Sequence, residues 1–302
     1  EKGKISKKSL EENISIGINC GSFSYADIPH QFKYIMGVTG TLKTLSEPEK
    51  EVVQKVYGIS KNTYAPSVFG KNNLGFSEKN DIFVENQDDY FNRIKNEIEC
   101  RIVGKIPETK RSVLVFFDSK KKLLEFYNSE TFSLMKNNTD ILIEETTPDE
   151  KEKVIKYATV SGKITLLTKS FGRGTDFISR DQIVIANGGT HVVQTFLSEE
   201  LSEEVQIKGR TARQGQTGSY SLVLLDSSLE WFLIKKEEIQ ENKGAYYNLL
   251  NEKRNNKFRD QYETNKDNII KARERHKESQ AFLLAISSGN MKEVEKFLLE
   301  QN

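Results

Sequence analysis

The sequence predicts an α/β protein in which a doubly wound parallel sheet is followed by a long-helix, all-α segment. Between residues 105 and 226, short continuous apolar runs alternate with amphipathic stretches. Runs of this kind, separated by helices, are typical of strands in a parallel sheet that helices cover on both faces. Residues 231–302 contain no proline, are rich in charged side chains and repeat apolar residues at helical spacing, which predicts a long helix.

The elements of the sheet domain can be predicted in chain order. The apolar runs predict strands over residues 113–117, 141–143, 164–167, 182–185 and 220–225. The stretches between them predict helices around residues 123–127, from Thr147 onward and over residues 201–213. The helix at Thr147 has the best-defined start, because a hydroxyl N-cap is followed by Pro148 and by acidic side chains that favour the positive end of the helix dipole.

The helix predicted after residue 231 carries a narrow apolar stripe. The stripe consists of Tyr246, Leu250, Phe258 and Tyr262, with an interruption at Arg254. Such a stripe predicts a charged helix that packs along the preceding domain. An arm that binds nucleic acid is less favoured, because the charges of this stretch nearly cancel.

Length and charge allow about two domains and exclude several classes of protein. The chain has 302 residues, and its 45 basic and 44 acidic side chains leave a net charge of +1. No global basic field would therefore recruit nucleic acid. Cys20, Cys100 and the three histidines lack metal-ligand spacing, so we expect a reducing compartment and no metal site.

We expect a soluble, cytoplasmic protein, because no apolar run approaches the roughly 20 residues that cross a bilayer. Peripheral membrane association would follow only if the protein acts as a translocase. The chain begins with Glu1 rather than methionine, which we interpret as a sign that it is a piece of a longer protein.

Three glycine-containing segments are candidates for a functional site. Residues 37–41 read G-V-T-G-T and follow residues 32–36, which we predict to be a strand. Residues 168–176 read T-K-S-F-G-R-G-T-D and leave the strand predicted at residues 164–167. Residues 206–215 read Q-I-K-G-R-T-A-R-Q-G and lie near the end of a predicted helix.

Two of these segments carry residues that suit phosphate or sugar recognition. Arg210 and Arg213 are three positions apart and would share one face of a helix, from which two guanidinium groups could reach phosphate oxygens. At the carboxyl edge of a parallel sheet, Gly172 and Gly174 would let the backbone approach a ligand, and Asp176 could accept hydrogen bonds from a sugar hydroxyl or an arginine. The alternatives are a surface arginine pair and an ordinary strand-to-helix turn.

Taken in order, these segments resemble the second RecA-like motor domain of the superfamily 2 helicases and translocases, and more closely the SecA family of protein-export ATPases. Residues 37–41 are similar to the family's G-M-T-G-T, and residues 172–176 match G-R-G-T-D. Residues 188–192 resemble G-G-L-H-V, and residues 206–215 resemble Q-L-R-G-R-A-G-R-Q-G. The resemblance covers roughly residues 30–232.

The chain also departs from the family pattern. The family's E-R-H-E-S is replaced by F-L-S-E-E at residues 196–200, and the methionine-alanine before G-R-G-T-D is replaced by Ser170 and Phe171. The segment between Asp176 and Gly188 is short. These differences bear on an export role more than on nucleotide chemistry.

The resemblance implies a site for ATP and Mg²⁺ that is completed by a first motor domain upstream. It implies catalytic arginine fingers at Arg210 and Arg213. It implies nucleotide-binding roles for Gly172, Arg173, Gly174, Asp176 and Gln206. Thr39, Gly40 and Thr41 would couple closure of the motor to movement of its substrate. We expect this chain to be unable to hydrolyse ATP alone, because it lacks a phosphate-binding loop and the adjacent acids that hold Mg²⁺.

The same resemblance predicts the domain organisation. Residues 1–45 would be the end of the first motor domain, residues 46–230 the second RecA-like motor domain, and residues 231–302 a helical scaffold-like segment. Residues 281–302 predict two helices around a glycine-centred break and resemble the helical half of an ankyrin repeat. The expected partners are the upstream motor domain, an unfolded polypeptide substrate and proteins that bind the ankyrin-like tail.

Two other functions remain open on the sequence alone. A helicase-type motor acting on RNA or DNA would need a basic groove and stacking aromatic residues. A degenerate motor could instead serve as a protein-interaction scaffold. His191 also has two interpretations, a nucleotide sensor or a hydrogen-bonded histidine at the sheet edge, and the neighbouring glycines and valines favour the second.

Overall fold

The computed structural model describes residues 6–13, 24–103 and 109–300. The chain forms two compact units, one of residues 37–259 and one of residues 1–36 together with 260–302. The predicted site lies in the larger unit. The first residue, Glu1, and one of the two cysteines, Cys20, lie outside the described residues, whereas Cys100 is exposed.

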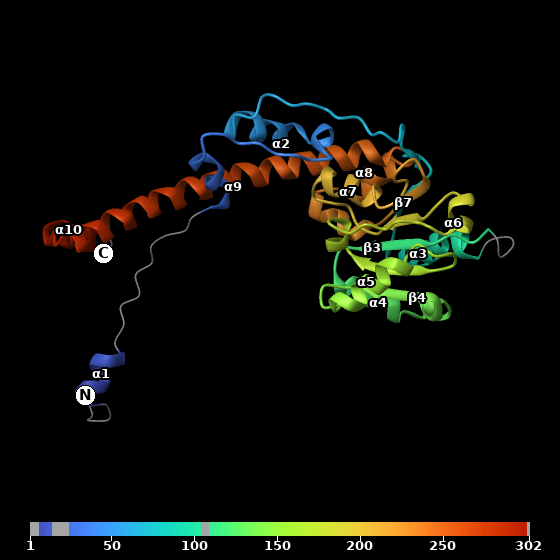
Figure 1. Cartoon of the computed structure of the whole chain (residues 1–302), viewed down its shortest axis with the longest axis horizontal. Coiled ribbons are helices and arrows are strands. Elements are labelled where there is room, and N and C mark those ends of the chain that lie inside the picture. Colours follow the sequence, from blue (N-terminus) through green and yellow to red (C-terminus); the bar gives the residue numbers. More distant parts are fainter. Residues whose placement is uncertain (1–5, 14–23, 104–108, 301–302) are drawn as a thin grey trace. The chain divides into compact units, whose positions relative to one another are not determined.

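The larger unit contains a parallel sheet. In the described residues its strands run in the order β1–β7–β6–β3–β5–β4, and β2 also pairs with β7. Their bounds are β1 Asn73–Gly75, β2 Ile82–Glu85, β3 Val113–Phe117, β4 Thr139–Leu142, β5 Ile164–Thr168, β6 His191–Gln194 and β7 Thr217–Leu225. Every pairing is parallel. The predicted RecA-like, doubly wound parallel sheet is confirmed, with helices on both faces (Figure 1).

The helices between the strands begin at polar caps. The α-helices of the described residues are α1 Lys7–Asn13, α2 Glu47–Glu51, α3 Gln87–Ile102, α4 Lys120–Asn128, α5 Pro148–Tyr157, α6 Gln182–Ala186, α7 Leu201–Lys208, α8 Lys236–Glu241, α9 Tyr246–Ser287 and α10 Met291–Glu300. Shorter helical segments are η1 Tyr25–Gln31, η2 Leu42–Thr44, η3 Val52–Val56, η5 Glu130–Asn138, η6 Lys169–Gly172 and η7 Asp226–Phe232. Thr147 caps α5 as predicted, because its side chain accepts a hydrogen bond from the backbone of Glu150.

The core has two layers because neighbouring residues of a strand point to opposite faces. All five residues of β3 are fully buried. Val113 and Val115 pack with side chains of α3 and α4. Leu114 and Phe116 belong to the other layer, which also contains Ile207 of α7. A strand buried on both faces explains why the sequence of β3 is continuously apolar rather than alternating.

Two predicted strands are wrong. Residues 182–185 form helix α6 instead, which Asp181 caps by accepting a hydrogen bond from the backbone of Ile183. Only Val184 of this helix is fully buried, and the strand of this region is β6, which begins at His191. Residues 32–36 form no strand, and the side chains of Phe32, Tyr34 and Met36 are exposed. A strand needs a neighbour for its backbone groups, and the described residues provide none here.

The helical segment after residue 231 is confirmed, since α9 runs from Tyr246 to Ser287. In the larger unit, Tyr246 and Leu250 pack against the core, and Arg254 is buried at the position where the apolar stripe is interrupted. Among the helices of the described residues, none has the length and apolar character needed to cross a lipid bilayer.

In the smaller unit, the end of α9 and α10 form a helical hairpin. The rings of Phe282 and Phe297 stack with their centroids 4.5 Å apart, and Gly289 makes the turn with a φ of +71°. The two predicted helices are therefore present. The resemblance to an ankyrin repeat finds no support, because the first helix of the hairpin is the last part of a 42-residue helix.

His191 lies inside the sheet rather than at its edge, because β6 is paired on both sides. Its Nδ1 atom lies 2.8 Å from Ser219 Oγ, and its Nε2 atom lies 3.2 Å from Ser221 Oγ. Burial lowers the pKa of His191 to about 4, assisted by Arg101 and Arg111 and opposed by Glu97, whose carboxylate lies 3.6 Å from Nε2. The ring is therefore neutral at pH 7.

We expect the free energy of unfolding to decrease by about 3 kcal/mol as the pH falls from 6.5 to 4, through His191 alone. The unfolded histidine takes up a proton near its ordinary pKa, whereas the folded one does so only near pH 4. Its contribution is therefore complete above pH 6.5. Urea unfolding at several pH values measures this, and the His191→Gln variant should lose correspondingly less stability in acid. An equal loss in both proteins would contradict the assignment.

Candidate nucleotide-facing site

The segment that follows β5 crosses one face of the sheet. It leaves the carboxyl end of β5 through η6 and buries Phe171 and Phe177 in the core. It then reaches the amino-terminal edge, where the carbonyl of Ser179 accepts a hydrogen bond from Gln216 Nε2 at 3.2 Å. The carboxylate of Asp181 accepts one there from the backbone of Ser161, which precedes β5. The expectation that this segment stays at the carboxyl edge is therefore wrong.

The glycines of this segment allow close packing and a tight turn. A Cβ atom on Gly172 would lie 2.7 Å from Ile207 Cγ1, so the backbone lies directly against α7. Gly174 has a φ of +65°, in the left-handed region that favours glycine. Both positions therefore bring Thr175 and Asp176 close to the end of α7.

The loop of residues 209–215, which we call the arginine loop, joins α7 to β7. The prediction of a helix through Arg213 is wrong, because α7 ends at Lys208 with Gly209 as its C-cap. Ala212 and Gln214 both have a φ of +52°, a value that residues other than glycine rarely adopt. Hydrogen bonds from outside hold the loop, since Thr211 Oγ1 donates to the carbonyl of Thr190 and Asn73 Nδ2 donates to that of Gly215.

The two arginines meet the segment after β5, although they do not share a helix face. Arg210 Nε donates to the carbonyl of Gln206 at 3.0 Å, and its Nη1 donates to the carbonyl of Thr175. Arg213 Nη1 forms an ion pair with Asp176 Oδ1. Burial lowers the pKa of Arg210, which is partly enclosed. The side chains of Arg213 and Asp176 are 40% and 50% exposed, so Arg213 is the arginine that can exchange its partner for a ligand.

Arg173 is not part of this cluster. Its Nη2 atom pairs with the carboxylate of Glu200 at 3.1 Å, and both side chains are about half exposed. Of the residues predicted for the site, the structure thus brings together Gly172, Gly174, Asp176, Gln206, Arg210 and Arg213.

The arginine loop lines a small pocket together with residues 176–179. Its free volume is about 20 Å³, which suffices for about one water molecule and is far too small for a nucleoside. At the arginine loop, this unit therefore presents a charged surface rather than a nucleotide cavity.

The predicted coupling segment leads into a short helix that contacts α7. Thr39 Oγ1 accepts a hydrogen bond from the backbone of Thr41 at 3.1 Å, and the carbonyl of Thr41 accepts one from Thr44 Oγ1 at 2.9 Å. Thr41 is buried, whereas Gly40 has no neighbouring atoms where a Cβ would lie. The segment continues into η2, which packs against α7. The helix that carries Gln206 thus contacts the stretch that follows the coupling motif.

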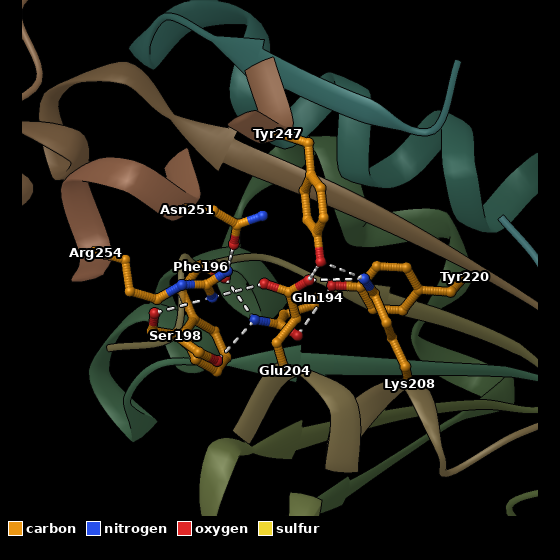
Figure 2. A network of polar contacts seen from close by, with 9 residues as sticks. All are labelled: Gln194, Phe196, Ser198, Glu204, Lys208, Tyr220, Tyr247, Asn251 and Arg254. Carbon is orange, nitrogen blue, oxygen red and sulfur yellow. Dashed lines mark hydrogen bonds and ion pairs between the residues drawn. The ribbon is translucent and has the colours of Figure 1, made fainter. Parts of the chain in front are cut away.

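Sequence reasoning missed a buried cluster of charged groups next to the arginine loop. Glu204 and Lys208 of α7 and Arg254 of α9 lie together in the interior (Figure 2). The interruption of the apolar stripe at Arg254 was the available signal, because a charged residue on the buried face of a helix needs a buried partner.

Comparison with models of protein families finds one match in this chain. Residues 94–215 match the sequence model of the helicase conserved C-terminal domain. The matched stretch includes the strands β3 to β6, α7 and the arginine loop. Residues 94–215 are therefore similar to a helicase C-terminal domain, the second RecA-like domain of superfamily 2 proteins.

Similar proteins include subunits of the protein translocase. The chain is 27% identical over 263 residues to the protein translocase subunit SecA of Thermosipho melanesiensis, covering 80% of this chain and 28% of that protein. It is 28% identical over 233 residues to the protein translocase subunit SecA 2 of Bacillus thuringiensis subsp. konkukian, covering 72% and 27%. The chain thus spans less than a third of the length of these relatives.

Among solved structures, S. cerevisiae Dbp5 bound to RNA and ADP BeF3 is similar at 17% identity, with a TM-score of 0.42. That likeness covers 67% of this chain and 48% of the yeast chain.

Proposed function

We propose that this chain is the second half of a SecA-like, ATP-driven motor that moves polypeptide and that it supplies the arginine side of the nucleotide site. The observation that carries the proposal is the convergence of Arg213 and Arg210 on Asp176 and Thr175, from two motifs far apart in the sequence. A planar guanidinium that can leave a carboxylate suits a developing charge on phosphate. ATP and Mg²⁺ would be held mainly by an upstream motor domain.

We also propose the domain roles that the sequence suggests. Residues 1–45 would belong to the upstream motor domain, and residues 231–302 to a helical scaffold. Phe32, Tyr34 and Met36 support this assignment, because they are exposed at alternating positions, as in a strand without its sheet. Thr39, Gly40 and Thr41 would then link the two motor domains, next to α7.

The charge of a second pocket favours polypeptide over nucleic acid. This pocket lies at the carboxyl ends of β3, β5, β6 and β7 and has a volume of about 380 Å³. Lys169 on its wall pairs with Asp118 at 3.0 Å, and Glu199 and Glu203 add further negative charge. With Lys122, the described wall of this pocket carries two cations and three carboxylates, whereas a phosphate backbone requires a basic groove.

A helicase that acts on RNA or DNA is the second candidate. The match to the helicase C-terminal domain favours it, and so does Trp231, which is 59% exposed on the wall of the same pocket and could stack on a base.

Stimulation of the ATPase distinguishes the candidates. In the full-length protein, we expect ATP turnover to rise when an unfolded polypeptide is added and to remain unchanged with single-stranded RNA or DNA. Steady-state phosphate release measures both responses. Stimulation by nucleic acid alone would contradict the polypeptide proposal and favour the helicase. An intact full-length protein without any ATP turnover would instead favour a degenerate motor that serves as a scaffold.

A further inference from the structure

A fully buried ion pair joins α7 to α9. The side chain of Glu204 is 0% exposed and that of Arg254 is 1% exposed, and Arg254 Nη1 lies 2.8 Å from Glu204 Oε2 (Figure 2). The same nitrogen donates to the carbonyl of Ser198 at 3.3 Å, and Arg254 Nη2 donates to Asn251 Oδ1. Arg254 thereby contacts the segment that precedes α7, at Ser198, and the middle of α7, at Glu204.

The second oxygen of Glu204 binds two further groups. Lys208 Nζ lies 2.7 Å from Oε1, and the hydroxyl of Tyr247 donates to the same atom at 2.8 Å. Lys208 Nζ also lies over the rings of Phe76, Tyr220 and Tyr247, at 4.1 to 4.9 Å from their centroids. Burial raises the pKa of Glu204, but Arg254 and Lys208 more than reverse this effect and keep the group ionised.

This cluster adjoins the arginine loop. Lys208 is the last residue of α7, and Gly209 begins the loop that carries Arg210 and Arg213. A buried ion pair contributes little net stability but is costly to break, so its main effect is to fix the relative position of the elements it joins. Here the elements are α9 and the helix that leads into the arginine loop.

We propose that Glu204 and Arg254 form a latch through which α9 sets the position of the arginine loop. Both are positioning residues, because neither touches the surface that would meet the nucleotide. The inference rests on the proposed function, in which the surface of the arginine loop faces ATP.

The neighbouring residue offers a matched control. Lys253 pairs with Glu238 of α8 at 2.6 Å and so ties α9 to α8 rather than to α7. Lys253→Met removes one cation from the same turn of α9 as Arg254→Met does. Arg254→Met therefore breaks the contact of α9 with α7, whereas Lys253→Met breaks its contact with α8.

Amide hydrogen exchange of the 302-residue chain tests the latch without ATP. In Arg254→Met, we expect exchange of residues 209–216 to accelerate at least about tenfold, while the amides of β3 and β5 keep their wild-type rates. Lys253→Met should leave the arginine loop unchanged. Unchanged exchange of the loop in Arg254→Met, or equal acceleration across all strands, would overturn the proposal.

A double variant that removes the charges of Glu204 and Arg254 tests the latch even if Arg254→Met fails to fold. Replacing a buried pair by apolar side chains often restores stability, and Lys208, which loses Glu204, retains three aromatic rings as neighbours, so the double variant Glu204→Leu, Arg254→Met should fold. We expect its arginine loop to exchange faster than that of the wild type even where thermal stability has recovered. Wild-type exchange of the loop in this variant would overturn the latch.

A kinetic measurement on the full-length protein complements the exchange. Because the latch positions groups that act on the transition state, Arg254→Lys should lower kcat for ATP by about tenfold and leave KM nearly unchanged. Unchanged kcat in an active protein would overturn the latch alone. A full-length wild type without ATPase activity would refute the proposed function, whereas the exchange result would still decide whether α9 holds the loop.

Discussion

Replacing Arg213 with alanine in the full-length protein is expected to lower ATP turnover by about 10³–10⁵-fold. An arginine finger stabilises negative charge that develops on the transferring phosphoryl group, so its loss acts on the chemical step. Arg213 is the better candidate for this role, because its single described partner is the half-exposed carboxylate of Asp176. Single-turnover ATP hydrolysis at saturating ATP measures the effect.

The control for this prediction is Arg180→Ala, which removes an exposed arginine from the segment that also contains Asp176. It should leave turnover within about twofold of the wild type, because solvent and salt screen an exposed charge that does not contact the ligand. Arg210→Ala is a less informative variant, because Arg210 also holds Gln206 and Thr175 in place. Full turnover in Arg213→Ala would remove this residue from the site.

Part of the sheet could be predicted from the sequence, although β6 is also fully buried and was not predicted. Residues 113–117 are continuously apolar and residues 164–167 are apolar except for Thr165, and both form strands whose side chains are fully buried. The helix at Thr147 was predictable for another reason, since its cap is a local interaction between residues three positions apart. Both signals are short-range, so neither depends on the rest of the fold.

Apolar composition alone could not distinguish a strand from a short helix at residues 182–185. Three consecutive apolar residues after Gln182 fit either, and the strand β6 begins at His191, after Gly188 and Gly189. A Cβ atom on Gly189 would lie 1.9 Å from the carbonyl oxygen of Thr217, so this position requires glycine to let β6 and β7 approach. That constraint comes from a strand nearly thirty residues later in the sequence.

The sequence predicted which residues form the site, but it did not predict how they are arranged. The motifs name Asp176, Arg210 and Arg213, but their spacing suggested a helix where the chain forms the arginine loop. The positive φ angles of that loop are stabilised by Thr190 and Asn73, which no local pattern connects to it. The partner of Arg254 likewise depends on the packing of α9 against α7, at a separation of 50 residues.

The isolated 302-residue chain is expected to bind Mg-ATP with a Kd of about 1 mM or weaker and to hydrolyse none. The phosphate-binding loop of a motor supplies most contacts to the ground state, and this chain lacks one. The structure adds a second reason. Arg213 already pairs with Asp176, and Arg210 already donates to Thr175, so phosphate competes with existing hydrogen bonds. The net gain therefore stays near the ~4 kcal/mol that corresponds to millimolar affinity.

Titration calorimetry of the isolated chain tests this prediction, with Asp176→Asn as a probe of the competing contact. Removal of the competing carboxylate should strengthen ATP binding by at most about fivefold, because the pair is half exposed and surface pairs contribute little. Addition of the upstream motor domain should instead restore both affinity and turnover, since it supplies the phosphate loop and the Mg²⁺ ligands. Micromolar ATP binding by the isolated chain would contradict the prediction, because the arginine surface with its pocket of about 20 Å³ could not provide it.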